Sequence, residues 1–284
     1  MQKILYQNQV FVTDNVEGIV PEFLTLLRGV IDSPDIPLNV SRSYLQADGA
    51  VKKISAYITR KVADKLSSLF KKDRKEFEKK WNDIKIVIEY GMLSEEKFYE
   101  KSEKFALYPT VDDKFYTYEE LYNKIKAKQT DKDEKLIILY ASDKQAQHSY
   151  IQNAKNKGYE VLLLDSPIVS HLIQKLETSK ENIQFARVDS DHIDNLINKD
   201  KNKISKLNDD QKKELEEIVK NIINDDKFVI KLEAMDSKEN PFIITNPEFM
   251  RRMKEMQQSG GGGMFGTGNM PEMFNLVINT NSDL

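Results

Sequence analysis

One short segment of the sequence combines an arginine and a glutamine with two prolines, and these residue types can bind a phosphate group. The segment, residues 32–46, reads DSPDIPLNVSRSYLQ, with Arg42 and Gln46 near its end. Pro34 and Pro37 fix their own φ angles and bias the residues before them away from helix, so we expect a loop of definite shape. A guanidinium held on such a loop can donate two parallel hydrogen bonds to a phosphate.

The residue types alone leave a structural alternative open. Arg42 could pair with a nearby acid such as Asp35, and Gln46 could cap the helix that follows. Asn39 and Ser41 could support the loop through hydrogen bonds from their side chains to the backbone. From spacing alone, the structural role is favoured over phosphate binding.

The elements that must position this loop can be predicted on both sides of it. Behind the loop, apolar residues recur every three or four positions from Val51 to Phe70 and predict one helix over 48–71, about 36 Å long at ~1.5 Å per residue. Ahead of the loop, residues 4–13 are predicted to form one strand, and Pro21 to start a helix that ends near Arg28. The loop would therefore be supported by a stiff helix.

The remaining pattern predicts helices followed by alternating strands and helices. Residues 77–106 show helical spacing, with a second helix ended by Gly91 and a third beginning at Ser94. Strand, helix and strand then alternate in the order expected of a right-handed βαβ unit with a parallel sheet. The predicted elements are a strand at 136–140, a helix at 142–156, a strand at 161–164, a helix at 167–176 and a strand at 185–188.

A polar stretch at 198–210 is the best candidate for a domain boundary. It contains asparagine, lysine, aspartate and serine but few apolar residues. After it, the pattern predicts a helix around 215–223, strands at 228–232, 242–244 and 274–278, and a helix from Asn246-Pro247 to about Gln257.

Composition excludes several classes of protein. The chain has 284 residues, about two domains at ~150 residues each, with 39% hydrophobic and 31% charged residues, which is typical of a soluble globular protein. The net charge of −3 disfavours nucleic-acid binding, and no apolar run approaches the ~20 residues of a membrane helix. The absence of cysteine excludes disulfides and thiolate metal sites and fits a reducing cytoplasm. The three histidines lack metal-binding spacing, so no metal site is predicted.

A second candidate site is a cluster of methionines near the end of the chain. Six of the nine methionines fall within residues 250–273, where a glycine-rich stretch favours exposure over tight packing. Methionine recurs on surfaces that bind many partners, although a core stripe is an equal alternative for the helical part. Trp81, the single tryptophan, is expected in the core, with an exposed binding role left open. The predicted binding set is Phe249, Met250, Met253, Met256, Met264, Phe265 and Trp81.

The order of several motifs resembles the middle domain of the heat-shock protein 90 chaperones, and in particular the bacterial branch of that family. The loop matches the family's pattern D-S-x-D-x-P-L-N-x-S-R-x-x-L-Q. Further matches are QVFVTD at 9–14, PEFL at 21–24, RGVID at 28–32, KKI at 52–54 and GYEVLLL at 158–164.

The resemblance implies a mixed α/β fold, α+β overall, built from part of a larger protein. Residues 1–200 would be the later half of the middle domain: the end of a large α/β subdomain (1–47), a helical connector (48–108) and a small α/β/α subdomain (109–200). Residues 207–284 would begin an α+β C-terminal domain, truncated before the helices that dimerise the family.

The resemblance also implies an ATP-dependent chaperone of the cytoplasmic stress response that binds unfolded or partly folded client proteins. In the family, the arginine matching Arg42 reaches in trans to the γ-phosphate of ATP in the N-terminal ATPase domain, with the residue matching Gln46 beside it. The motifs of that nucleotide pocket do not occur here, so we expect a fragment that binds no cofactor and is not an enzyme alone, although the intact protein would use ATP and magnesium. The intact protein would be a homodimer and the fragment a monomer. The alternative is a nucleotide-binding enzyme built on residues 136–188, but no glycine-rich turn follows its first strand.

Overall fold

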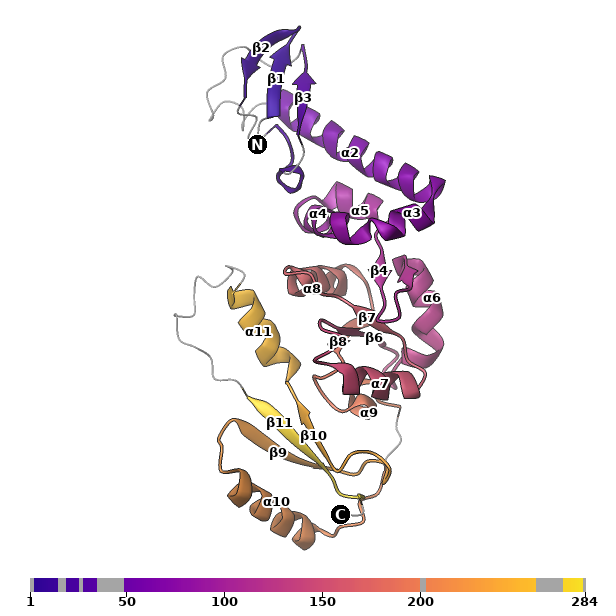
Figure 1. Ribbon diagram of the computed structural model, residues 1–284, viewed down its shortest axis with the longest axis vertical. Coiled ribbons are helices and arrows are strands. Elements are labelled where there is room, and N and C mark those ends of the chain that lie inside the picture. Colours follow the sequence, from indigo (N-terminus) through magenta and orange to yellow (C-terminus); the bar gives the residue numbers. More distant parts are fainter. Residues whose placement is uncertain are drawn as a thin grey trace. The chain divides into compact units, whose positions relative to one another are not determined.

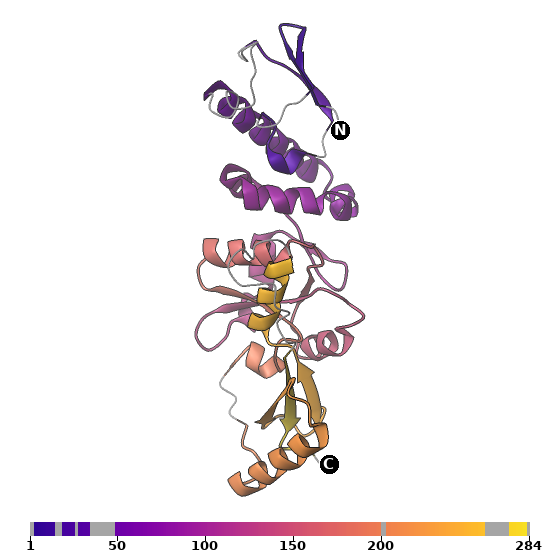
Figure 2. The ribbon, with the colours of Figure 1, turned by 90° about the vertical axis from the view of Figure 1, so that its left-hand side faces the viewer.

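The computed structural model describes residues 3–14, 19–25, 28–34, 49–199, 203–258 and 273–282 (Figures 1 and 2). Contacts between residues divide the chain into two units, Met1–Leu107 and Tyr108–Leu284. Helices and small sheets occur in both, so the α+β class expected from the sequence is confirmed. The predicted division into a middle and a C-terminal domain near residue 200 stays a prediction.

The first unit begins with a three-stranded sheet in the order β2-β1-β3. Its strands are β1 (Lys3–Gln7), β2 (Val10–Thr13) and β3 (Gly29–Asp32), with β1 antiparallel to β2 and parallel to β3. The single strand predicted over 4–13 is wrong. Asn8 and Gln9 adopt positive φ angles of 49° and 66° and close a two-residue hairpin, and asparagine tolerates this conformation better than most residues.

The long helix behind the proline loop is confirmed as α2 (Gly49–Lys72). Its first turn buries Val51 against Leu5 and Ile19 of the sheet region, with Ile31 of β3 packed on the same cluster. The strand before the loop and the helix after it are therefore attached to one small core. The helix predicted from Pro21 is only a 3-10 turn, η1 (Glu22–Leu24).

Three further helices, α3 (Arg74–Lys79), α4 (Trp81–Ser94) and α5 (Glu96–Ser102), complete the first unit. Gly91 does not end a helix as predicted but lies inside α4. A Cβ atom there would come within 2.8 Å of the rings of Phe23 and Phe98, so glycine permits the close packing of η1 and α5 on α4. Trp81 is 2% exposed and its ring centroid lies 6.3 Å from that of Phe77, as the core interpretation expected.

The second unit contains the predicted parallel βαβ arrangement. The sheet order is β7-β6-β8, and β6 pairs in parallel with both neighbours. Every residue of β6 is buried, which is typical of a strand covered on both faces. The elements of this part of the second unit are β4 (Tyr108–Pro109), β5 (Phe115–Tyr116), α6 (Tyr118–Gln129), β6 (Leu136–Ala141), α7 (His148–Asn156), β7 (Val161–Leu163), α8 (Val169–Ser179), β8 (Ile183–Arg187) and α9 (Ile193–Leu196).

The end of the second unit is a sheet in the order β10-β11-β9 with a helix on one face (Figure 1). The helix, α10, begins at a capping box in which Asn208 and Gln211 bond each other's backbone N–H, and it ends at Asn224 with a φ of 42°. Its core contact is Val219 against Leu276 and Ile278. The elements are α10 (Asp209–Ile223), β9 (Phe228–Glu233), β10 (Phe242–Thr245), α11 (Glu248–Gln258) and β11 (Phe274–Asn279).

None of the helices within the described ranges combines the length and the apolar character needed to cross a bilayer.

Candidate functional site

The proline loop is attached to the sheet at the end that the structure describes. Ser33 N donates to Tyr6 O at 3.0 Å, and Gln7 Nε2 donates to Pro34 O at 3.1 Å. Asp32 Oδ2 accepts from the N–H of Gln9 at 3.1 Å, which ties the end of β3 to the hairpin turn. The residues predicted to act on phosphate, Arg42 and Gln46 with Asn39 and Ser41, lie outside the described residues.

Helix α11 is anchored to the small α/β part of its unit by charged residues. Glu248 Oε1 accepts hydrogen bonds from Arg252 Nε at 2.7 Å, Arg251 Nη2 at 2.5 Å and the Tyr140 hydroxyl at 3.1 Å. Arg251 also donates to the Tyr140 hydroxyl. We call these residues, together with Glu177, the α11 anchor. It joins the first turn of α11 to the end of the central strand β6.

The second arginine extends the anchor to α8 and β8. The Arg252 guanidinium donates to both carboxylate oxygens of Glu177, at 2.8 and 3.3 Å, and to Phe185 O at 2.8 Å. The same Glu177 carboxylate accepts from Phe185 N at 2.7 Å. Two parallel bonds between arginine and carboxylate fix orientation as well as charge. The side of α11 that carries Arg252 is therefore held facing α8, and the two helices lie side by side (Figure 1).

The electrostatics of the anchor favour the ionised carboxylate. Burial opposes ionisation of Glu248, but the positive charges of Arg251 and Arg252 outweigh it, and the pKa of Glu248 is lowered. Burial and the Glu248 charge raise the pKa of Tyr140. The hydroxyl therefore stays protonated and donates a hydrogen bond to Glu248. Arg251 is only 6% exposed, and burial of such a charge is stable only when it is paired as here.

The apolar residues of α11 lie on a different side of the helix from the anchor. Phe249 is 71% exposed, although phenylalanine is usually buried, and Met250 and Met253 are half-buried. Met256 lies within α11, but its side chain is outside the described residues, as are Met264 and Phe265. Trp81, the remaining member of the predicted binding set, is buried in the first unit and offers no surface to a partner.

The turn after β6 tests the alternative of a nucleotide-binding enzyme. Gln147 Oε1 accepts from the N–H of Ser142 at 2.8 Å and of Asp143 at 3.0 Å. Asp143 Oδ1 accepts from the N–H of Gln145 and Ala146. The backbone donors that would have to hold a phosphate at this position are thus bonded to the protein's own side chains. These bonds also explain why α7 starts at His148 and not near Ser142 as predicted.

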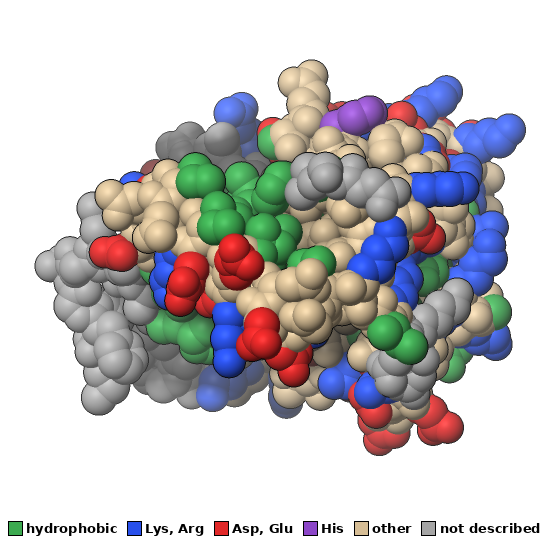
Figure 3. Space-filling view, turned by 90° about the horizontal axis from the view of Figure 1, so that it is seen from below, with side chains coloured by type: hydrophobic (Ala, Val, Ile, Leu, Met, Phe, Trp, Pro, Cys, Tyr) green, Lys and Arg blue, Asp and Glu red, His purple; other side chains and the backbone are tan. Residues whose placement is uncertain are grey.

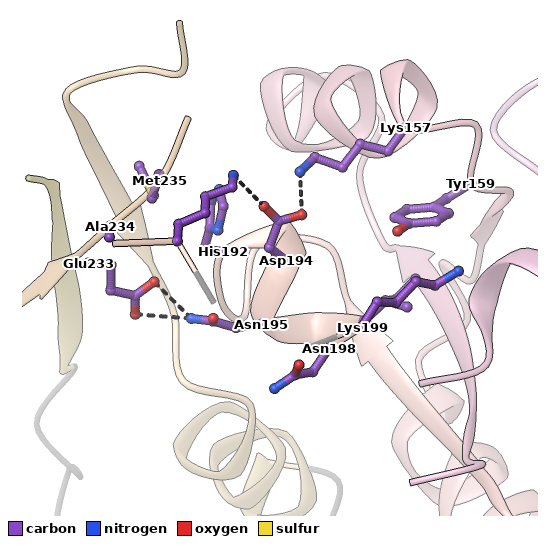
Figure 4. Close-up of a pocket in the computed structure, with 12 residues that line it drawn as sticks. Lys157, Tyr159, His192, Asp194, Asn195, Asn198, Lys199, Glu233, Ala234 and Met235 are labelled. Carbon is purple, nitrogen blue, oxygen red and sulfur yellow. Dashed lines mark hydrogen bonds and ion pairs between the residues drawn. The ribbon is translucent and has the colours of Figure 1, made fainter. Parts of the chain in front are cut away.

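The α11 anchor was not predicted from the sequence, and neither was a polar pocket between α7, α9 and the segment after β9 (Figure 4). It has a volume of about 490 Å³. Lys157 and Lys203 both contact the Asp194 carboxylate, Lys203 at 2.9 Å. Across the pocket, Asn195 Nδ2 donates to the Glu233 carboxylate at 3.0 and 2.9 Å. Hydrogen bonds therefore connect α9 to the last residue of β9.

Three side chains near this pocket have the chemistry of metal ligands. His192, Asp194 and Glu239 place ligand atoms within 4.8 Å of one another, and His192 Nε2 lies 2.5 Å from Glu239 Oε2. Lys157 lies 3.4 Å and Lys203 3.8 Å from Glu239, so two ammonium groups already balance the two carboxylates. Burial opposes ionisation of Asp194, but bonds from both lysines lower its pKa. These side chains form a network of ion pairs that connects separate segments of the unit. Sequence spacing could not predict the network, because its lysines and Glu239 lie far apart along the chain.

Exposed apolar side chains also gather beside α10. Ile218 is 49% and Ile222 is 77% exposed on the helix, and Phe242 and Ile244 of the edge strand β10 are 43% and 47% exposed. Figure 3 views this end of the molecule and shows a group of hydrophobic side chains bordered by acidic ones. The apolar face of the α10 layer therefore continues beyond the part that α10 covers.

Comparisons with known proteins identify the family of this chain. The family model described as Hsp90 protein matches residues 2–261. The chain is 54% identical over 283 residues to the chaperone protein HtpG of Bacteroides thetaiotaomicron and 49% identical to that of Porphyromonas gingivalis. Each match covers 99% of this chain and 41% of the relative. The chain belongs to the Hsp90 family, and these relatives place it in the bacterial HtpG branch.

More distant relatives carry the same name. The chaperone protein HtpG of Bdellovibrio bacteriovorus is 29% identical over 238 residues, which are 79% of this chain and 37% of the relative. The chain thus spans about two fifths of the length of the HtpG proteins that it matches over nearly its whole length.

Proposed function

We propose that this chain is part of an ATP-dependent molecular chaperone and that α11 binds unfolded or partly folded client proteins. The observation that carries the proposal is the orientation of α11. Its charged residues are bonded to the body of the unit, whereas Phe249 on another side is 71% exposed. An amphipathic helix that leaves an aromatic ring exposed beside half-buried methionines is suited to hydrophobic segments of other chains. The names of the HtpG relatives support a chaperone role.

The composition of the stripe supports binding of many different clients. Met250 and Met253 flank the exposed ring, and methionine has a flexible, polarizable side chain that adapts to varied partners. The anchor holds the backbone of the helix in place while the Phe249 ring stays exposed. Low sequence specificity is the expected property of such a surface.

The test is capture of an aggregating client. Phe249→Ser combined with Met253→Ser should reduce suppression of aggregation at least tenfold at a fixed chain concentration, because the contact loses its apolar area. The matched control is Ile222→Ser on α10, which also removes an exposed apolar side chain. Suppression that survives the double change, or falls equally in the control, contradicts the proposed site. Circular dichroism of each variant checks that the fold is intact.

We further propose that Arg42 and Gln46 contact the γ-phosphate of ATP bound by the ATP-binding domain of the family, with Asn39 and Ser41 supporting the loop. The pattern of the loop and the membership of the Hsp90 family support this role. An arginine is suited to it because its charge is permanent and its fork bonds phosphate bidentately. Magnesium would accompany the nucleotide in that other domain.

Complementation tests the second proposal. The separate ATP-binding domain of an HtpG relative is mixed with this chain, and ATP turnover is compared between the starting chain and Arg42→Ala. Stimulation by the starting chain and at least tenfold less stimulation by the variant are expected, as for other arginines supplied in trans to a phosphoryl group. Equal stimulation by both chains would remove Arg42 from the reaction. Arg28→Ala is a control for the loss of one arginine near the loop.

A further inference from the structure

A groove in the first unit is lined by lysines from two helices. Lys71 and Lys72 belong to the last turn of α2, and Lys101 and Lys104 lie at the end of α5 and just after it. The groove has a volume of about 570 Å³, within the range of small-molecule sites, which is ~300–1,000 Å³. Ser67 and Ser68 add hydroxyl groups to the lining.

The positive charge of this groove is only partly neutralised. Asp64, the one carboxylate among the described residues that line the groove, bonds Lys101 Nζ at 2.5 Å, and this bond lowers the pKa of Asp64. Within the described part of the chain, the ammonium groups of Lys71, Lys72 and Lys104 have no acidic partner. The surrounding helix increases the effect, since α2 carries seven lysines and arginines and one acidic residue. Lysines near the carboxyl end of a helix interact favourably with its dipole, but that effect does not require two helices to bring four ammonium groups to one groove.

The lining also limits the type of anion. Among the described residues that line the groove there is neither arginine nor an aromatic ring, so it offers no planar fork for a single carboxylate and no platform on which a base could stack. Ammonium groups act as compact point charges, and the hydroxyls of serine can donate hydrogen bonds to phosphate oxygens. We propose that this groove binds a compact anion that carries several phosphoryl groups and does not need a nucleobase for recognition.

The probe is inorganic tripolyphosphate, titrated calorimetrically into the full chain at 50 mM and 200 mM salt. Saturable binding that weakens with salt is expected, because the site works through charge. Lys71→Ala combined with Lys104→Ala should weaken binding at least tenfold. Lys124→Ala combined with Lys220→Ala is the control, because it removes the same charge from exposed lysines of the second unit and should change binding less than twofold.

A gain of affinity gives an independent test. Asp64→Asn removes the one carboxylate of the groove and releases Lys101, so tripolyphosphate should bind several-fold more tightly. Asp113→Asn, which breaks the exposed pair with Lys144, should leave the affinity unchanged. The proposal is overturned if the starting chain shows no saturable binding, or if the two double variants lose affinity equally. It is also overturned if an oligoglutamate of equal charge binds more tightly than tripolyphosphate, which would assign the groove to an acidic polypeptide.

Discussion

Helices α10 and α11 are both amphipathic, and α10 precedes the strands of the small sheet while α11 lies between β10 and β11, yet they face the protein in opposite ways. Helix α10 turns Val219, with Leu215 and Ile223 beside it, toward the sheet, as most surface helices do. Helix α11 turns Glu248 and its two arginines toward the body and leaves Phe249 exposed. A hydrophobic period therefore identifies the two faces of a helix, but it does not say which of them is buried.

The comparison also shows two ways of attaching a helix. Apolar contacts such as those of α10 are tolerant of small shifts, because burial of apolar area has no direction. The α11 anchor depends on hydrogen bonds of defined geometry between Arg252, Glu177 and Glu248. The charged attachment leaves Phe249 exposed, and an exposed apolar side chain is what the proposed client binding requires.

The largest expected effect on stability is the loss of the anchor. Arg252→Ala should lower the free energy of unfolding of the second unit by about 3 kcal/mol, because two partly buried carboxylates lose a partner. Unfolding in urea measures the change. The control is Lys144→Ala, which breaks an exposed ion pair with Asp113 and should cost less than about 0.5 kcal/mol. Similar costs for both variants would show that the anchor is no stronger than a surface pair.

A smaller effect is expected from the apolar attachment of α10. Val219→Ala should cost about 2 kcal/mol through lost burial and the cavity that remains. Suppression of client aggregation should stay unchanged, since Val219 is buried on the side of α10 that faces the sheet. A loss of suppression without loss of folded protein would mean that the α10 layer also takes part in client binding.

Acid should weaken the anchor of α11 but not the attachment of α10. The pKa of Glu248 is lowered from the usual 4.5, so its ionised form stabilises the fold. That contribution is fully present above pH 4.5 and is lost as the pH falls through the lowered value. The stability difference between the starting chain and Glu248→Gln should therefore shrink between pH 7 and strong acid. A difference independent of pH would show that charge on Glu248 contributes nothing.

The smallest effect is expected at the apolar stripe itself. Phe249→Ser should change the free energy of unfolding by less than about 0.5 kcal/mol, because the ring is already 71% exposed. Urea unfolding of this single variant gives the value. A cost near that of Val219→Ala would mean that the ring is packed against the protein, and the contrast between the two helices would disappear.

Much of the local structure could be predicted from the sequence. The periodicity from Val51 to Phe70 predicted α2, and the apolar run at 136–140 predicted the buried strand β6 with its parallel neighbours. Predictions failed where a backbone conformation or a distant contact decided the outcome. The hairpin turn at Asn8 and Gln9 interrupts an apolar pattern that reads as one strand, and Gly91 lies inside a helix where the lack of a side chain makes room for two rings.

The candidate sites likewise have features that the sequence predicts and features that depend on tertiary contacts. The sequence by itself determined the family, the pattern that singles out Arg42 and the apolar stripe of α11, because motifs and helical periods are local properties of the chain. Only the tertiary structure decided which side of α11 is bonded to the body. It did so because Tyr140 and Glu177, far away in the sequence, meet Arg251 and Arg252 in space. The lysine groove has the same origin, since α2 and α5 bring together charges that no spacing rule connects.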